Sequence, residues 1–499
     1  MNPLITQIPN NTDYIDGHIL QQWFANSHDV IVETNLYGDP PAIVPIVLVY
    51  CTGMTETRNI NDIILPDLQR IYNQTKFSRK EDIVRAAEVT LTPVEPYMKG
   101  FDRHLISARI FEGHLLLCFP SLQTMWTIDI ANLPARSPSE STSEVSILGP
   151  KDGFVEMLTH NVALIRKRLR SPMLTCQYHV IGTRTMTKVA LLYVEDIADP
   201  TIIKYIHKKI SATKIESLNY MNQMEEIITS KSSQIFPLTN YTGRPDFAVD
   251  CLLNGRFIII VDGNPSVIIA PVNLFLLLKS PEDAYFSYFG VNVGRLLRML
   301  GLLLTIFLPG FYIALTAFHP DQIPFPLLST ISTGRAGLPM ESGLEMFFIM
   351  ILMELFREAG VRLPSPIGQT LTVVGGLIIG DAAIRAGLVS PLMIVVTATT
   401  IVAGSTLVNQ ILNSSLLLLR LVSFLFAVVL GMYGFILSII LFVIYTSSLE
   451  SFGVPYLAPL APLNIKGAFH SLFKVPFQWN KKRPSYLHTQ KPRKQPRKE

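Results

Sequence analysis

Charged side chains interrupt the most apolar part of this 499-residue sequence. The stretch "IMILMELFREAGVRLPSPIG" carries Glu354, Arg357, Glu358 and Arg362. A charge at the centre of a bilayer costs about 2.5–3.5 kcal/mol, so four charges facing lipid would cost on the order of 10 kcal/mol. Glu354 with Arg357 at i+3, and Glu358 with Arg362 at i+4, can instead pair along one helix. Two interpretations stay open: the charges belong to an ion path through the membrane, or the helix enters the cytosol at Glu354.

Glu345 precedes the apolar residues 346–353, which follow it on the same expected helix. This apolar core spans only about 12 Å at 1.5 Å per residue, whereas the hydrocarbon layer is about 30 Å thick. We therefore expect several copies of the helix to surround a water-filled path, with Glu345 facing the lumen. Phe348 and Leu352, at i+3 and i+7 from Glu345, are the candidates for a constriction or gate.

Two glycines follow this charged helix at the spacing that lets helix backbones approach closely. Gly376 and Gly380 form a GxxxG pattern in "PIGQTLTVVGGLIIGDAAIRAG", next to Asp381. We regard both as helix-packing candidates, and substitution of either by Leu is expected to impair oligomers. Whether 366–380 is a re-entrant segment is left open.

Sequence signatures of catalysis are missing from the chain. The sequence has no GxxxxGK[ST], GxGxxG, GxSxG or HExxH pattern. Four scattered cysteines show neither a CxxC pair nor metal-ligand spacing, which favours buried free thiols; they are Cys51, Cys118, Cys176 and Cys251. We predict that the protein is not an enzyme and uses no cofactor or metal.

The composition indicates a membrane protein, since 49% of residues are hydrophobic, 16% are charged and the mean hydropathy is +0.34. No charge occurs in 299–318 or in 421–449, and each run exceeds or matches the ~20 residues of a membrane-spanning helix. We predict an all-α polytopic domain with four crossings, and whether 406–420 also crosses is left open. The four crossings are 297–318, a tilted 342–357, 387–404 and 421–447.

Basic residues predict that both termini lie in the cytosol. Arg295 and Arg298 precede the first apolar run, and the last 19 residues, "KKRPSYLHTQKPRKQPRKE", carry eight Lys or Arg against one Glu. The beginning of the chain lacks the pattern of a secretory signal, so we expect the first half to stay in the cytosol. A short basic tail beside a membrane domain favours contact with anionic lipid over nucleic acid, and we predict no nucleic-acid partner.

The first half of the chain alternates strand and helix patterns. We expect a strand in 42–55, a helix in 59–74, two short strands in 104–119, and a subdomain boundary in 131–144. Beyond it we expect a helix capped by Asp152, a strand at 187–194 and a hairpin in 256–272. The predicted domains are an α/β subdomain 1–135, an α/β subdomain 145–280, a transmembrane helical domain 281–455, and a partly disordered cytosolic basic tail 456–499.

Four segments carry a resemblance to a known family: "GPKDGFVEMLTHNVALIRKRL", "TKVALLYVEDIADP", "FREAGVRLPSPIGQTLTVVGGLIIGDAAIRAGLVSP" and "SLESFGVPYLAPLAP". Over about 148–463 the chain resembles the A subunit of the GerA-type spore germination receptors. The resemblance implies the inner spore membrane, a transporter-like B subunit, a lipoprotein C subunit, nutrient sensing and an oligomeric ion channel. It offers no catalytic residue. One departure is "GSTLVNQILN", where many members have a proline and an aromatic residue after the third span.

We therefore expect a subunit of a nutrient-gated receptor that forms or gates an ion path. The alternatives are a secondary transporter subunit and a membrane-anchored signalling scaffold without its own pore. A transporter should show an internal repeat, and none is evident in the sequence. A scaffold would not need Glu345 inside the membrane.

Overall fold

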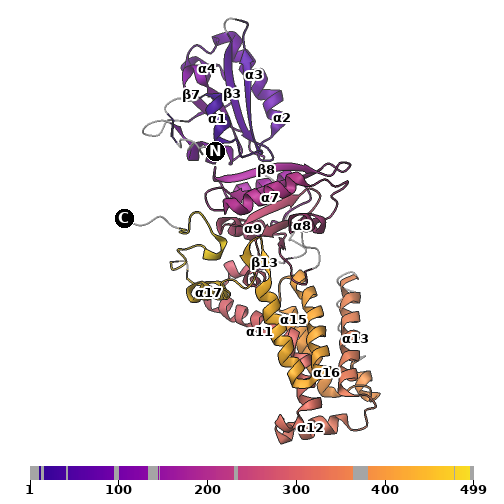
Figure 1. Cartoon of the computed structure of the whole chain (residues 1–499). Helices are drawn as coiled ribbons and strands as arrows, with labels where there is room; N and C mark the ends of the chain where they lie inside the picture. Colours follow the sequence, from indigo (N-terminus) through magenta and orange to yellow (C-terminus); the bar gives the residue numbers. More distant parts are fainter. Residues whose placement is uncertain are drawn as a thin grey trace. The chain divides into compact units, whose positions relative to one another are not determined.

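A computed structural model of the chain describes residues 11–12, 16–40, 43–94, 101–132, 144, 146–229, 234–362, 380–476 and 478–494. The chain forms two compact units (Figure 1). Unit 1 comprises Met1–Ser232, Thr239–Pro271 and Phe477–Glu499, and it is α/β. Unit 2 comprises Ser233–Leu238 and Val272–Pro476, and it is mainly helical.

An antiparallel five-stranded sheet with helices on both faces forms the first part of unit 1. Alternate residues of its second strand point to opposite faces, so Val47 and Val49 pack under one helical layer and Ile46 and Leu48 under the other. The strands, in sheet order, are β2 (Val30–Tyr37), β3 (Val44–Cys51), β6 (His114–Phe119), β7 (Thr124–Asp129) and β4 (Thr92–Pro93). The helices α1 (Gly17–Trp23) and α5 (Arg103–Ile110) cover one face. The other face is covered by the π-helical turn Ile60–Ile64, which follows α2 (Thr57–Asn59), and by α3 (Leu65–Thr75) and α4 (Lys80–Ala86). A separate short pair is formed by β1 (Asn11–Thr12) and β5 (Phe101–Asp102).

A second antiparallel sheet follows in unit 1. The predicted hairpin is confirmed, because β11 (Phe257–Val261) pairs with β12 (Val267–Ala270) across the turn at Asp262 and Gly263. The order is β10 (Asn240–Thr242), β12, β11, β9 (Thr187–Val194) and β8 (Leu174–Ile181). Its helices are α6 (Leu158–Arg168), α7 (Pro200–Ala212), α8 (Met221–Thr229) and α9 (Pro245–Leu253).

Unit 2 contains two segments that are long and apolar enough to cross a membrane, among the residues that the structure describes. They are Tyr288–Phe318 and Gln410–Ser448. The helices of the unit are α10 (Leu274–Leu277), α11 (Tyr288–Ile313), α12 (Phe325–Arg335), α13 (Ser342–Arg362), α15 (Pro391–Ser405), α16 (Gln410–Ser448) and α17 (Ile465–Leu472), with a short β13 (Glu450–Ser451) and β14 (Val454–Pro455) hairpin.

The helix α16 reverses direction at Gly431. Gly431 has φ 61° and ψ −138°, outside the helical region. Ser423 and Ser438 would lie about 22 Å apart along a straight helix, yet their hydroxyl oxygens are 3.0 Å apart. The limbs 410–430 and 432–448 therefore run back along each other. The prediction of one last crossing over 421–447 is wrong, because that range contains the turn between two segments.

The two ends of the helical unit are tied together. The Val272 amide donates to the Ser451 hydroxyl at 3.0 Å, and the Leu274 amide donates to the Tyr456 carbonyl at 2.9 Å. The Asn273 side chain donates to the Ala458 carbonyl at 2.7 Å. The segment that enters α11 and the segment that leaves α16 therefore lie at the same end of unit 2.

Two local expectations differ from the structure. Residues 103–110 form α5 instead of a strand, because Asp102 caps the His104 amide and Ile106 and Ile110 pack together against the sheet. The helix after Asp152 begins only at Leu158, whose amide donates to Asp262 Oδ1 at 3.0 Å, while Asp152 pairs with Arg168.

The C-terminal tail contacts both units where the structure describes it. Residues 456–476 belong to unit 2, and 478–494 pack on unit 1. Arg483 Nε donates to the Leu253 carbonyl at 2.7 Å, and Lys491 pairs with Asp196 at 2.7 Å. The polar groups of these residues therefore have partners on the α/β surface.

Candidate functional site

The charged end of α13 forms an ion network with α16. Glu354 pairs with Arg357 one turn along its own helix, as predicted. Its second carboxylate oxygen, Oε2, accepts from Arg420 Nη2 at 3.1 Å. Arg420 is only 6% exposed, so its guanidinium is removed from solvent. The carboxylate thus lies between two guanidinium groups, one of which the sequence analysis missed.

Glu345 does not face a lumen in this structure. Its side chain is fully buried, and its Oε1 accepts the Ser390 amide at 2.5 Å. Ser390 is the N-cap of α15, where backbone N–H groups lack partners within the helix and favour a negative charge. Arg335 of α12 lies 3.8 Å from the other carboxylate oxygen. The expected lumen-facing position is therefore corrected: Glu345 connects α13 to α12 and α15.

The two gate candidates have different surroundings. Phe348 is 45% exposed, whereas Leu352 packs against a buried apolar cluster that includes Ile349 and Phe424. Phe348 belongs to an exposed apolar stripe at i, i+4, i+7 and i+11 of α13. The stripe is Leu344, Phe348, Ile351 and Leu355.

The other predicted residues can be placed only in part. Glu358 is exposed on α13, and the side chain of Arg362 lies outside the described residues, so the predicted pair between them stays a prediction. Gly376 also lies outside the described residues. A Cβ added at Gly380 would lie 3.9 Å from Ile394, an ordinary contact distance.

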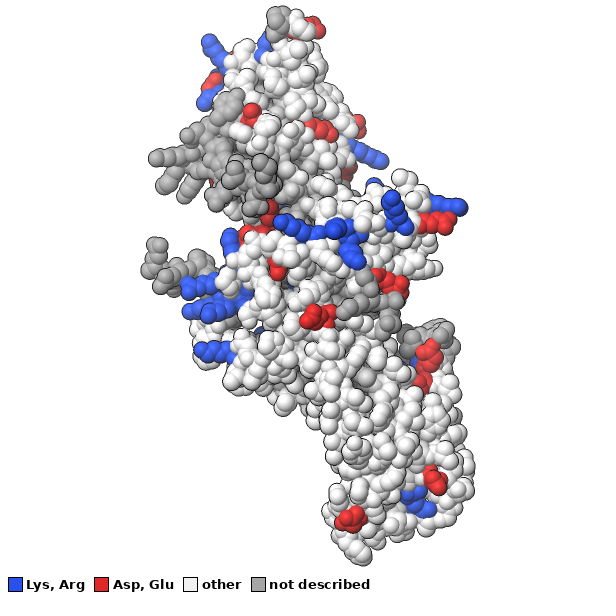
Figure 2. Space-filling view, viewed as in Figure 1, with Lys and Arg blue, Asp and Glu red and all other residues white. Residues whose placement is uncertain are grey.

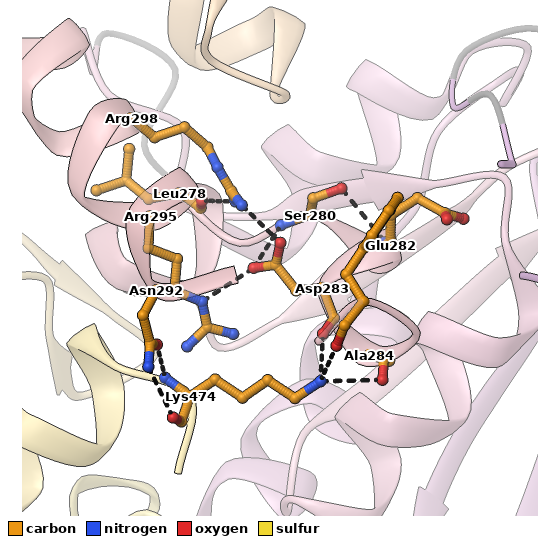
Figure 3. Close-up of polar contacts among 10 residues, drawn as sticks. Leu278, Ser280, Glu282, Asp283, Ala284, Asn292, Arg295, Arg298 and Lys474 are labelled. Carbon is orange, nitrogen blue, oxygen red and sulfur yellow. Dashed lines mark hydrogen bonds and ion pairs between the residues drawn. The ribbon is translucent and has the colours of Figure 1, made fainter. Parts of the chain in front are cut away.

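A second ion network at the start of α11 was not predicted (Figure 3). Asp283 accepts from Arg298 Nη2 at 2.5 Å and from Arg295 Nε at 2.9 Å. Arg298 also donates to the Leu278 carbonyl. In the sequence, these arginines indicated only the orientation of the first crossing. The signal that was missed was an acidic residue 12 and 15 positions upstream.

Lys474 completes this network by capping a short helical turn. Its ammonium group donates to the carbonyls of Asp283, Ala284 and Phe286 at 2.7, 3.1 and 3.0 Å (Figure 3). Its backbone amide donates to Asn292 Oδ1 at 2.6 Å. Burial, and then the neighbouring Arg295, lower the pKa of Lys474, and Asp283 opposes this shift. The segment after α17 is thereby fixed to the first turns of α11.

A buried ion pair joins the two sheets of unit 1. Arg166 of α6 donates to both oxygens of Asp29, from Nε at 2.7 Å and from Nη2 at 2.9 Å, and neither side chain is exposed. The neighbouring Ser27 forms a β-bridge with Cys176 of β8. Cys51, Cys118, Cys176 and Cys251 are buried free thiols, as predicted. Within the described ranges, no cluster of three or more potential ligands is arranged to hold a metal ion.

The arrangement in unit 2 is suited to stabilising charge inside an apolar surface. Figure 2 shows that the visible face of the helical part is nearly free of charged side chains, except towards its ends. Arg420 is buried and Glu354 is partly buried, so close pairing offsets part of the cost of desolvating their charges. These residues give the helices a polar contact, and they do not form a catalytic constellation.

Comparison with known proteins identifies the family. The model of the Bacillus/Clostridium GerA spore germination protein family matches residues 18–486. Spore germination protein XA of Bacillus anthracis is 42% identical over 475 residues, covering 95% of this chain and 96% of the relative. The uncharacterized membrane protein YfkQ of Bacillus subtilis is 32% identical over 438 residues, covering 88% of this chain and 84% of the relative.

A solved structure is also similar to part of the chain. It is the N-terminal domain of the A subunit of the Bacillus megaterium spore germinant receptor GerK3, with a TM-score of 0.39 and 24% identity, covering 53% of this chain and 96% of that chain. The family match extends over nearly the whole chain, through both units and both ion networks of unit 2. The chain therefore belongs to the GerA family of spore germination proteins.

Proposed function

We propose that this chain is the membrane-embedded A subunit of a nutrient-sensing germination receptor, and that several copies form or gate an ion path. The ion network of Glu354, Arg357 and the buried Arg420 carries the proposal, because an apolar bundle that only anchored a soluble domain would not need it. Family membership and the similarity to a membrane protein support the same location, the inner membrane of the spore.

The exposed stripe of α13 supports assembly from several copies. One face of this helix packs on the buried cluster around Met346, Ile349 and Met350, and the opposite stripe around Phe348 has no partner among the described residues. A second copy of the chain would cover this stripe or leave it lining the path. In this arrangement Phe348 is the constriction, and Glu345 holds the start of α13 against the start of α15.

The connection between the ends of unit 2 supports an even number of crossings. Segments 272–274 and 451–458 are hydrogen-bonded, which fits both termini on the cytosolic side. Labelling of cysteines introduced near 140 and near 490 in intact cells should place both sites on that side. Labelling on opposite faces would contradict the multi-pass topology proposed here.

The gate is tested in spores that carry variants of this chain. Phe348→Ala should release potassium without nutrient, because the smaller side chain widens the constriction. Leu352→Ala tests the second candidate, and Glu345→Gln should alter nutrient-triggered release because the neutral amide caps α15 less well. Val429→Ala, on an exposed position of α16, is the matched control. If no variant leaks and Glu345→Gln responds normally at normal protein level, α13 is not the conduit.

The proposed partners are a transporter-like B subunit and a lipoprotein C subunit, with lipid around the helices. Affinity purification of this chain from spore membranes should recover both subunits and further copies of the chain. Purification of a monomer without them from gently solubilised membranes would argue against the proposed receptor assembly.

A further inference from the structure

The short helix α17 has three distinct faces. Successive residues of a helix are separated by about 100°. Ala468 and Ser471 form a buried face. Ile465 and Phe469 are exposed and form the next face around the helix. The exposed Lys466 and His470 form the third face. Ile465 is 75% exposed and Phe469 is 52% exposed. The helix therefore presents an apolar strip between the face that packs on the protein and a basic face.

The helix α17 lies beside the first turns of α11. Its Ser471 and Leu472 line a small cavity together with Arg295 and Met299 of α11. The hydrogen bonds between Asn292 and the Lys474 backbone, at 2.6 and 3.2 Å, fix the segment that follows the helix. The flank of α11 that holds α17 is therefore formed by residues 292, 295 and 299.

An exposed apolar stripe of α11 begins next to this flank. It repeats at i, i+4, i+7 and i+11, which is one face of a helix. The stripe is Phe289, Val293, Leu296 and Leu300. The exposed Leu460 and Leu463 precede α17 in the chain. An apolar surface thus continues from the start of a candidate membrane-spanning helix onto a short helix fixed to its side.

We propose that residues 460–473 form a membrane-interface element, in which α17 lies in the plane of the bilayer at the end where α11 begins. Ile465 and Phe469 enter the boundary between headgroups and acyl chains, and Lys466 faces the lipid phosphates. This inference rests on the proposed membrane embedding of unit 2. It adds a lipid contact that sets the depth of α11.

A lipid surface explains the pattern of this helix better than a protein partner does. The basic side chain lies beside the apolar strip, as in helices that are half inserted in the interface. The strip also continues the apolar stripe of α11, a helix that the proposed function surrounds with lipid. A protein partner would require neither this continuity nor the lateral basic face.

Fluorescence quenching in nanodiscs tests the position of α17 in the full-length chain. A fluorophore is attached at Phe469→Cys, and the four native cysteines are buried. The discs contain phosphatidylcholine and phosphatidylglycerol with a quencher either near the headgroup or deep in the acyl chain. We expect at least twofold stronger quenching at Phe469→Cys by the shallow quencher than by the deep one.

Two matched sites separate this inference from the proposed function. Leu303→Cys, on the exposed side of α11, should be quenched by the deep probe, and Met186→Cys, exposed on unit 1, by neither. No quenching at Phe469→Cys with strong quenching at Leu303→Cys would overturn the inference and leave the membrane embedding intact. Crosslinking of Phe469→Cys to another protein chain instead of lipid would also overturn it. No quenching at Leu303→Cys would overturn both.

Discussion

Breaking the ion network of α13 and α16 should have unequal effects, depending on which side chain is removed. Glu354→Gln leaves Arg357 and the buried Arg420 without their shared carboxylate. Removing one partner of a buried ion pair costs about 3–5 kcal/mol, and the partial exposure of Glu354 places this change near 3 kcal/mol. Arg420→Met leaves Glu354 paired with Arg357, so we expect a loss of only about 1 kcal/mol.

The double variant decides whether the two residues act together. Once the carboxylate is neutral, removing Arg420 also removes the uncompensated buried charge, so Glu354→Gln with Arg420→Met should be more stable than Glu354→Gln alone. The expected coupling is about 2 kcal/mol, within the range of about 0.5–3 kcal/mol for residues in one network. Every 1.4 kcal/mol corresponds to about a tenfold change in the folding equilibrium.

Equilibrium unfolding of the purified protein in nanodiscs measures these differences. The control is Asp381→Asn, which breaks the exposed pair of Asp381 with Arg385 in the same unit and should cost less than about 1 kcal/mol. Equal losses for Glu354→Gln and Arg420→Met, combined with additive behaviour in the double variant, would refute the network as described.

Three further predictions concern other parts of the chain. Arg166→Met should lower the stability of unit 1 by about 3–5 kcal/mol, because it leaves buried Asp29 unpaired, whereas Arg184→Met in the exposed pair with Glu216 should change it little in thermal unfolding. Gly434→Ala should disrupt the reversal of α16, since its Cβ would lie 2.0 Å from the Phe426 carbonyl oxygen; Gly294→Ala in α11 is the control, and equal yields of folded membrane protein would contradict the expectation. Burial, together with His207 and His28, lowers the pKa of His179 in the folded protein below its ordinary 6.5. The stability that neutral His179 contributes is therefore present above about pH 6.5 and is lost as the pH falls through the lowered folded-state pKa. His179→Gln should reduce that acid sensitivity, and an unchanged dependence of melting temperature on pH would assign it to other groups.

Local patterns were sufficient to predict much of unit 1. The strand β3 follows from its own apolar run, and the β11–β12 hairpin follows from the turn residues between its strands. Both patterns lie within a few neighbouring positions of the sequence. Helix α5 was not predicted because it has few apolar residues, and their spacing does not distinguish a helix from a strand. Its N-terminal Asp102 was the available signal.

The ion networks show why the candidate site was predicted only in part. The pair of Glu354 with Arg357 follows from spacing on one helix. Arg420 lies 66 residues away, so only tertiary packing brings it to Glu354. The reversal of α16 did leave a signal, because an uncharged run over 421–449 would extend about 43 Å as one helix, well beyond the ~30 Å hydrocarbon layer. Gly431 and Gly434 lie near its middle.

The bonds between segments 272–274 and 451–458 also determine when the bundle can be completed during synthesis. The Val272 amide can form its hydrogen bond only after Ser451 has been synthesised, 179 residues later. The Asn273 side chain likewise requires Ala458, which is synthesised 185 residues later. At about 5–20 residues per second the delay is roughly 9–37 s. During that interval the entrance to α11 has no partner from the end of the bundle. A ribosome that stops before Ser451 would therefore release a chain whose first helix lacks its closing contacts, and such chains should be early substrates of membrane proteases.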